Sequence, residues 1–383
     1  MHTDIDLVHV IFKTHLDVGF TDYARVVVDR YLTRFIPDAI TLAEDMQRDY
    51  PLETFRWTVG AWLIYEYFER AAPDQRRRLE QAVLNNLVAW HAAPFTTHTE
   101  LMDERLFRYG LSLSQKLDQR FGKRTIAAKM TDVPGHTRAM IPLLAEAGVR
   151  FFHVGVNPAS TVPDVPPVFK WRDEASATEV MMMYQQVYGD VMLLPGTMEA
   201  VALVFTGDNL GPPSRESVHQ TYAELRRAFP NARFIGSTLD AVADSIERAQ
   251  PPLPVITDEI GDTWIHGIGT DPTKVSQYRE LLRLRSQWIE TGRIDDTRLD
   301  RFHHALLMIP EHTWGMDLKT HLRDHEHYDT SVLASMRAKP KFRRYEASWD
   351  EQRDYVRQAL AALEGTPLRA EANQRLSAIA PRR

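Results

Sequence analysis

An almost unbroken apolar run near the start of the chain constrains the fold most. Residues 7–12 read L-V-H-V-I-F, and the segment K-T-H-L-D-V-G-F follows directly. A continuous apolar run of this length is typical of a strand that is buried on both faces of a parallel sheet. Gly19 ends the run, and apolar residues at helical spacing follow it. The run therefore predicts an α/β fold whose first strand ends close to His15 and Asp17.

His15 and Asp17 are the first candidate site residues. They stand at the carboxyl end of the expected strand, which is where α/β folds place their ligands. Side chains two apart on a strand point the same way, so an imidazole and a carboxylate could meet one cation. His15 could equally satisfy polar groups at a buried strand end, and Asp17 could cap the next helix. This segment alone leaves a metal-binding and a structural hypothesis open.

Strand patterns alternate with helical patterns as far as residue 273. Strands are expected at 55–59, 125–130, 151–156, 180–185, 202–206, 233–235 and 255–259, and helices at 61–70, 75–90, 103–121 and 139–147. This alternation predicts an irregular seven-stranded parallel (β/α) barrel, a catalytic domain over residues 1–273. The later pattern is helical, at 275–290, 296–308, part of 318–337 and 349–361. It predicts a small all-helical domain over residues 274–383 with a polar C-terminal tail.

The composition narrows the kind of site. The chain has no cysteine, which excludes disulfides and thiolate metal ligands. A transition metal would need His, Asp or Glu ligands, which are typical of open catalytic sites. The net charge of -6 gives no electrostatic signature for nucleic acid or an anionic membrane. The first residues are acidic and lack a basic-then-apolar pattern, so we expect no secretory leader, and no uncharged apolar segment is as long as a membrane span. We expect a soluble, cytoplasmic protein, and homo-oligomer formation is left open.

Three later segments carry further candidates. Asp132 follows an expected strand and precedes a Pro-Gly turn into a helix, with His136 as a partner for its carboxylate; a helix N-cap is the alternative. Asp208 lies in F-T-G-D-N-L-G-P-P, where glycines let the backbone approach a ligand closely. His266 lies in D-T-W-I-H-G-I-G-T, a loop whose glycines and Trp264 suggest a role other than core packing. Each segment alone is a weak signal.

Together these segments resemble glycoside hydrolase family 38, the zinc-dependent α-mannosidases. The family's H-x-D-x-G-W resembles residues 15–20, and its D-P-F-G-H-S resembles residues 132–137. Its acid loop resembles residues 207–212, and its late histidine with a following G-T resembles residues 266–270. Order and spacing agree over about residues 7–285. The first two motifs are specific, and the last two are loose.

The resemblance implies a retaining glycosidase that binds one Zn²⁺ per chain. It implies the zinc ligands His15, Asp17, Asp132 and His266. Asp132 would also be the nucleophile that forms a covalent glycosyl-enzyme intermediate, and Asp208 would be the general acid and base. Such chemistry needs two carboxyl groups about 5 to 5.5 Å apart. The implied substrate is a carbohydrate with α-linked mannose or a similar sugar.

The substrate-binding predictions rest on aromatic and polar residues near the expected barrel mouth. Phe20 replaces the family's tryptophan, and Trp264 stands where the family has an acidic residue. Trp62, His98 and Glu100 are further candidates, with an ordinary polar loop as the alternative. Family members usually continue into β-sandwich domains that contribute to the site, and no such region is recognised here. These departures affect the expected sugar more than the expected metal.

Two other functions fit part of the pattern. A zinc-dependent carbohydrate deacetylase also places Asp and His at strand ends, but it normally shows paired aspartates after its first strand, and Asp17 is unpaired. A catalytically silent carbohydrate-binding or scaffold protein would keep the fold without turnover. The three hypotheses differ in whether an aryl α-mannoside is hydrolysed, acetate is released, or a sugar is only bound.

Overall fold

The computed structural model describes residues 1–260, 264, 269, 271–318 and 329–381. The chain forms two compact units. The first contains Met1–Leu16, Asp29–Thr96 and Phe107–Thr263, and the second contains Asp17–Val28, Thr97–Leu106 and Trp264–Arg383. The boundary between the units therefore lies directly after His15 and Leu16 in the sequence, and two early segments belong to the mainly C-terminal unit. The domain division expected at residue 273 stays a prediction.

The first unit contains a sheet with β1 at its centre. β1 (Leu7–His15) is buried at every position after Leu7, as its apolar run predicts. The strand order is β3-β2-β1-β9-β8, and β10 also pairs with β1. The partners are β2 (Trp57–Gly60), β3 (Val88–His91), β8 (Val191–Leu193), β9 (Glu199–Asp208) and β10 (Arg233–Gly236). All pair in parallel except β8, which is antiparallel to β9, so the main strands end on the same edge.

A second sheet in the same unit has the order β11-β6-β7-β5-β4. Its strands are β4 (Ala127–Asp132), β5 (Phe151–Val156), β6 (Val168–Asp173), β7 (Thr178–Gln185) and β11 (Val255–Ile256). β6 is antiparallel to β7, and the other pairs are parallel. The amide of Ala92, which follows β3, donates to the carbonyl of Ala127 in β4 and joins the two sheets. The α/β class is thus confirmed, whereas one closed seven-stranded barrel is not confirmed.

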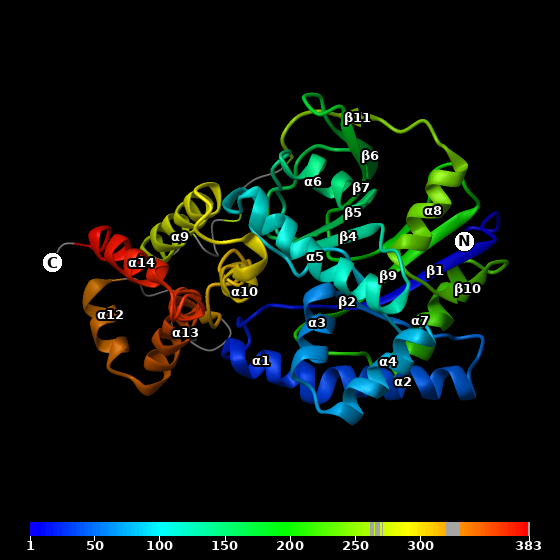
Figure 1. The fold of residues 1–383 in the computed structure, drawn as a ribbon. Helices are drawn as coiled ribbons and strands as arrows, with labels where there is room; N and C mark the ends of the chain where they lie inside the picture. Colours follow the sequence, from blue (N-terminus) through cyan, green and yellow to red (C-terminus); the bar gives the residue numbers. More distant parts are fainter. Residues whose placement is uncertain (261–263, 265–268, 270, 319–328, 382–383) are drawn as a thin grey trace. The chain divides into compact units, whose positions relative to one another are not determined.

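Helices connect the strands of the first unit (Figure 1). They are η1 (Tyr31–Phe35), α2 (Ile36–Asp49), α3 (Ala61–Arg70), α4 (Pro73–Leu84), α6 (Met140–Glu146), α7 (Arg215–Ala228) and α8 (Leu239–Ala249). α1 (Ala24–Arg30) and α5 (Glu104–Phe121) each cross the boundary between the units. Ser214 and Thr238 cap α7 and α8 by accepting backbone amides. α8 packs its apolar face into a core cluster that includes Ile11 of β1 and Phe151 of β5.

The second unit is helical in its C-terminal part. Its helices are α9 (Pro272–Glu290), η4 (Asp296–Leu299), α10 (Asp300–Leu307), α12 (Thr330–Arg337), α13 (Pro340–Ala362) and α14 (Pro367–Ala378). Asp271 caps α9, and Pro272 occupies a first-turn position whose missing amide proton costs nothing. An apolar cluster with Met336, Phe342 and Tyr345 packs α12 against α13. The helical pattern expected after residue 274 agrees with these elements.

Several expected elements differ from the structure. The helix expected over 75–90 ends at Leu84, and residues 88–91 form β3 instead. Asn86 adopts a φ of +59°, a left-handed conformation that stops a helix and that Asn tolerates well. The strands β6 and β8 and the helices α7 and α8 were not anticipated. None of the described helices is both long enough and apolar enough to cross a membrane.

Candidate functional site

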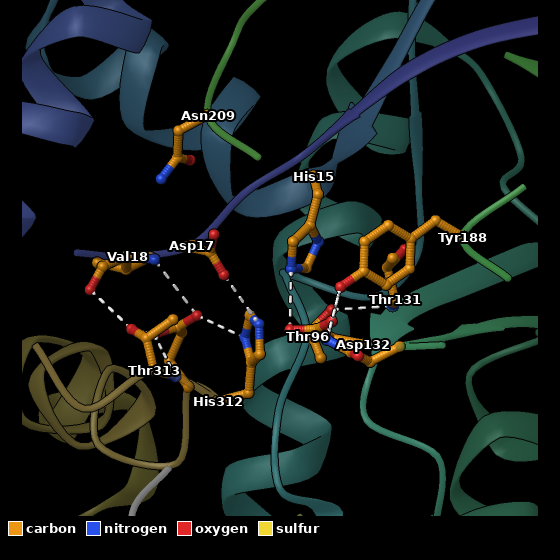
Figure 2. Close-up of polar contacts among 12 residues, drawn as sticks. His15, Asp17, Val18, Thr96, Thr131, Asp132, Tyr188, Asn209, His312 and Thr313 are labelled. Atoms are coloured by element: carbon orange, nitrogen blue, oxygen red, sulfur yellow. Dashed lines mark hydrogen bonds and ion pairs between the residues drawn. The ribbon is translucent and has the colours of Figure 1, made fainter. Parts of the chain in front are cut away.

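His15 and Asp132 form a buried pair in the first unit. They are the last residues of β1 and β4, two strands whose carboxyl ends carry the polar side chains. Nε2 of His15 lies 3.7 Å from Oδ2 of Asp132, and both side chains are buried (Figure 2). The sequence expected both residues at strand ends, and the fold brings them together across the two sheets.

Asp132 is held by two neutral hydrogen-bond donors. The hydroxyl of Tyr188 donates to Oδ1 of Asp132, and Nδ2 of Asn157 donates to the same oxygen over 2.9 Å. The Tyr188 ring also stacks on the His15 imidazole, with 5.8 Å between ring centres. Asp132 has a φ of +85°, a conformation that costs about 1–3 kcal/mol and that is concentrated at functional sites. These contacts fix one carboxylate oxygen and direct the other toward His15.

Asp208 lies beside His15 in the same sheet. It is the last residue of β9 and stands opposite His15 in the strand register. The amide of Asn209 donates to the His15 carbonyl over 3.0 Å, and the Tyr31 hydroxyl donates to that carbonyl over 3.1 Å. Gly207 adopts a φ of +104°, which favours glycine and turns the chain sharply before Asp208. The expected acid loop is therefore tied to the end of β1, with a half-buried Asp208 at its start.

Asp17 and His312 form a second buried pair, in the second unit. Nε2 of His312 lies 3.1 Å from Oδ1 of Asp17, and the two side chains are 1% and 3% exposed. Nδ1 of His312 lies 2.8 Å from Oε1 of Glu311. An imidazole that is protonated only at Nδ1 presents a lone pair at Nε2, which is the nitrogen that faces Asp17 here. A cation bound by both Nε2 and Asp17 would remove the repulsion between that lone pair and the carboxylate.

Glu311 is itself fixed by its surroundings. Its carboxylate accepts the Thr313 amide over 3.1 Å and the Val18 amide over 3.3 Å. The Thr313 hydroxyl donates to Glu311 as well, and Figure 2 shows the Val18, Thr313 and His312 contacts. A carboxylate that orients the far nitrogen of a histidine is common behind metal-ligating imidazoles. Gly19, with a φ of +131°, lets the chain turn directly after Asp17 and Val18.

These two pairs supply two imidazoles and two carboxylates, all buried, and this donor set could bind a metal ion. The chemistry of the set agrees with the absence of cysteine, because nitrogen and oxygen ligands are what remain. His15, Asp17 and Asp132 were expected as ligands. His266 lies outside the described residues, and its role stays a prediction.

His312, Tyr188 and Asn157 were not anticipated from the sequence. His312 follows α10 in the segment M-I-P-E-H-T-W, where a buried apolar run meets polar residues. That change from apolar to polar is the same signal that marked His15, but a helix rather than a strand precedes it. Asn157 comes directly after β5, and Tyr188 follows β7 by three positions. Their positions after strands were visible in the sequence, but their contact with Asp132 depends on the fold.

The expected substrate-binding residues occupy varied surroundings. Phe20 packs edge-on against Trp314 at 5.7 Å between ring centres. Trp62 is buried and packs edge-on against Phe95. His98 is fully buried, Trp264 is buried, and Glu100 is exposed. The roles of all five in substrate binding stay predictions.

His136 and Lys13 are buried titratable groups near the strand ends. His136 packs edge-on against Phe152, its amide donates to the Ile260 carbonyl, and burial lowers the pKa of its imidazole to about 3. Its expected role as a partner of Asp132 stays a prediction. Burial also lowers the pKa of Lys13 to about 7, although contact with Lys129 and the charges of the nearby aspartates oppose this shift.

A comparison with family models matches residues 268–383 to a domain of unknown function (DUF5054). A search of curated proteins found no match. Among solved structures, an alpha-mannosidase from Enterococcus faecalis V583 has a TM-score of 0.58 at 13% identity, over 94% of this chain and 42% of that chain. A protein in Glycosyl Hydrolase Family 38 from Enterococcus faecalis has a TM-score of 0.55 at 12% identity, over 94% and 40%.

A GH57 branching enzyme from Thermococcus kodakaraensis has a TM-score of 0.55 at 11% identity, over 98% of this chain and 94% of that chain. The chain thus spans about two fifths of the two Enterococcus structures and nearly all of the branching enzyme. Likeness at such identities concerns the fold, because one fold supports many activities. The chain has a fold that is also found in glycoside hydrolases.

Proposed function

We propose that the protein is a metal-dependent retaining glycoside hydrolase that acts on α-linked mannose or a similar sugar. The observation that carries the proposal is the pair of buried His–Asp contacts next to the ends of β1 and β4. The family resemblance of the motifs around His15 and Asp132, and the fold shared with an alpha-mannosidase structure, support the choice of substrate.

Covalent geometry supports one shared ion rather than two. Only Leu16 separates His15 from Asp17, so their Cα atoms are at most about 7 Å apart whatever the conformation of the chain. Asp132 lies beside His15, and His312 lies beside Asp17. We therefore propose His15, Asp17, Asp132 and His312 as ligands of one Zn²⁺, with His266 as the competing fourth ligand. A zinc ion here would act as a Lewis acid toward sugar hydroxyl groups.

Two carboxylates are proposed to carry out nucleophilic attack and proton transfer. Asp132, fixed through Oδ1 by Tyr188 and Asn157, is proposed as the nucleophile that attacks the anomeric carbon. Asp208, at the end of β9 beside β1, is proposed to protonate the leaving oxygen and then to take a proton from the attacking water. Retention of configuration follows from these two successive displacements.

Metal analysis and a turnover assay test the proposal. Purified protein should contain about one zinc ion per chain, hydrolyse an aryl α-mannoside, lose that activity with a chelator, and regain it with zinc. Activity that a chelator leaves unchanged would reject the metal dependence. Release of acetate from acetylated sugars would support the deacetylase hypothesis instead, and sugar binding without turnover would support the scaffold hypothesis.

Replacing the nucleophile gives a second test. Asp132→Ala should abolish turnover and weaken zinc retention together, because one carboxylate has both roles. Asp164→Ala removes an exposed loop carboxylate and is the matched control. An Asp132→Ala protein with normal turnover would show that the nucleophile is a different residue.

A further inference from the structure

A small cavity inside the first unit is lined by basic and hydroxyl side chains. Its volume is about 40 Å³, which exceeds the roughly 10–15 Å³ that a single water molecule requires. The described residues that line it include no aspartate or glutamate. Its polar lining comes mainly from β1, β2, β3 and β4: Lys13, Thr14, His15, Thr58, His91, Lys129 and Thr131, with Thr96 after β3. The cavity is therefore polar, and its fixed charge is positive or zero.

Both lysines are buried, and in the described part of the chain neither makes a direct contact with a carboxylate. Nζ of Lys13 donates to Oγ1 of Thr131 over 2.9 Å and lies 5.0 Å from the centre of the Phe205 ring. Nζ of Lys129 lies 2.7 Å from Nδ1 of His153. Within the described part of the chain, neither ammonium group has a carboxylate oxygen within 4.0 Å. Burial lowers the pKa of both amines, that of Lys13 to about 7. Even a neutral amine has two protons, so each lysine keeps a donor for a group in the cavity.

Thr58 gives an independent indication of a ligand. Its hydroxyl lines the same cavity, its side chain is 4% exposed, and Oγ1 has no hydrogen-bond partner among the described residues. A buried hydroxyl without a partner costs roughly 1–3 kcal/mol, so such groups nearly always contact something. The Thr58 hydroxyl and the two lysines line the same small cavity, so one ligand there would be within reach of all three.

We infer that this cavity binds one small monovalent anion of about the size of chloride, held by Lys13, Lys129 and the hydroxyl of Thr58. An anion would favour the charged forms of the two lysines, which burial opposes and which no carboxylate of the described residues contacts within 4.0 Å. A water molecule could satisfy Thr58 but would add no charge. His15 also lines the cavity, but the inference does not depend on the proposed glycosidase activity, because it rests on Lys13, Lys129 and Thr58 and its tests need no turnover.

Bromide diffraction tests the site directly. Crystals of the full chain soaked in sodium bromide should show an anomalous peak at the bromine edge, within hydrogen-bonding distance of both Nζ atoms and Oγ1 of Thr58. Density there without an anomalous peak would identify water and overturn the inference. Peaks found only on the surface would overturn it as well.

Thermal unfolding in solution gives a second measurement. Replacing sodium gluconate by sodium chloride at constant ionic strength should raise Tm by about 1–2 °C, the shift expected for a chain of this length when chloride exceeds its Kd about fivefold. Lys129→Met and Thr58→Val should each remove most of that shift. Lys341→Met, at an exposed position in α13, should keep it. A wild-type Tm that does not respond to chloride, or a Lys129→Met protein that responds fully, would overturn the inference.

Discussion

The hydroxyl of Tyr188 donates to Oδ1 of Asp132 while the ring of the same tyrosine stacks on His15. One side chain thus positions both members of the buried pair at the ends of β1 and β4. Asn157 donates to the same carboxylate oxygen and also to the Tyr188 hydroxyl over 2.8 Å. Three hydrogen bonds among Asp132, Asn157 and Tyr188 therefore orient the carboxylate proposed as nucleophile. Removing one of these hydrogen bonds should have a measurable effect on catalysis.

Tyr188→Phe should keep the stacked ring and remove only the hydroxyl. We expect kcat to fall by about 10–100-fold and metal affinity to weaken less than in Asp132→Ala, since the outer partners of a site typically contribute on that scale. Steady-state kinetics with an aryl α-mannoside and a zinc titration measure the two effects. Tyr50→Phe, at a half-exposed position after α2, is the control. Unchanged kcat in Tyr188→Phe would mean that this hydrogen bond does not position a reacting group.

A pair of histidine variants separates the two candidates for the fourth ligand. If His312 binds the ion, His312→Ala should lower zinc affinity by orders of magnitude, and His266→Ala should leave the metal content close to that of the wild type. His304→Ala, at a half-buried position in α10, controls for general effects of histidine removal. Metal content measured after dialysis decides the matter. Full zinc content in His312→Ala together with loss in His266→Ala would reverse the assignment.

The sequence was informative where a ligand follows a buried strand. The apolar run of β1 located His15 and Asp17, and the end of β4 located Asp132, because parallel strands gather their carboxyl ends. His312 was missed because it follows a helix, and no pattern in the local sequence indicates that the loop after this helix contacts Asp17. The strand β3 was read as helix because its four residues are too short to show their own periodicity. Contacts between distant segments are set by tertiary packing, which one sequence does not display.

Asp208→Asn should separate acid catalysis from metal binding. The variant keeps the shape of the side chain at the end of β9 but cannot donate a proton as a carboxylic acid does. We expect zinc content to stay near the wild-type value and kcat to fall by about 10²–10⁴-fold for substrates with poor leaving groups. Activated aryl substrates should be affected far less in the glycosylation step. Equal losses across a series of leaving groups would argue against Asp208 as the general acid.

Asp240 gives a prediction about stability that is independent of the site. Its Oδ1 accepts the amides of Ile126 over 2.8 Å and of Ala127 over 2.9 Å, and burial raises its pKa to about 6. The pKa in the unfolded chain is about 3.9, so the folded state binds the proton more tightly. Folding stability should therefore fall as pH rises from about 4 to 6, by about 2 kcal/mol in total, with the full penalty present above pH 6.

Asp240→Asn keeps an Oδ1 acceptor for both amides and removes the titration. The free energy of unfolding of the variant should thus increase relative to that of the wild type as pH rises from 4 to 6. Urea denaturation at several pH values measures both. Asp244→Asn, on the same helix α8 and paired at the surface with Arg150, should follow the wild-type curve closely. If the free energies of unfolding of Asp240→Asn and the wild type changed in parallel with pH, the buried carboxyl group would have the same pKa in the folded and unfolded chains. The hydrogen bonds from its two backbone amides would then offset the effect of burial on that pKa.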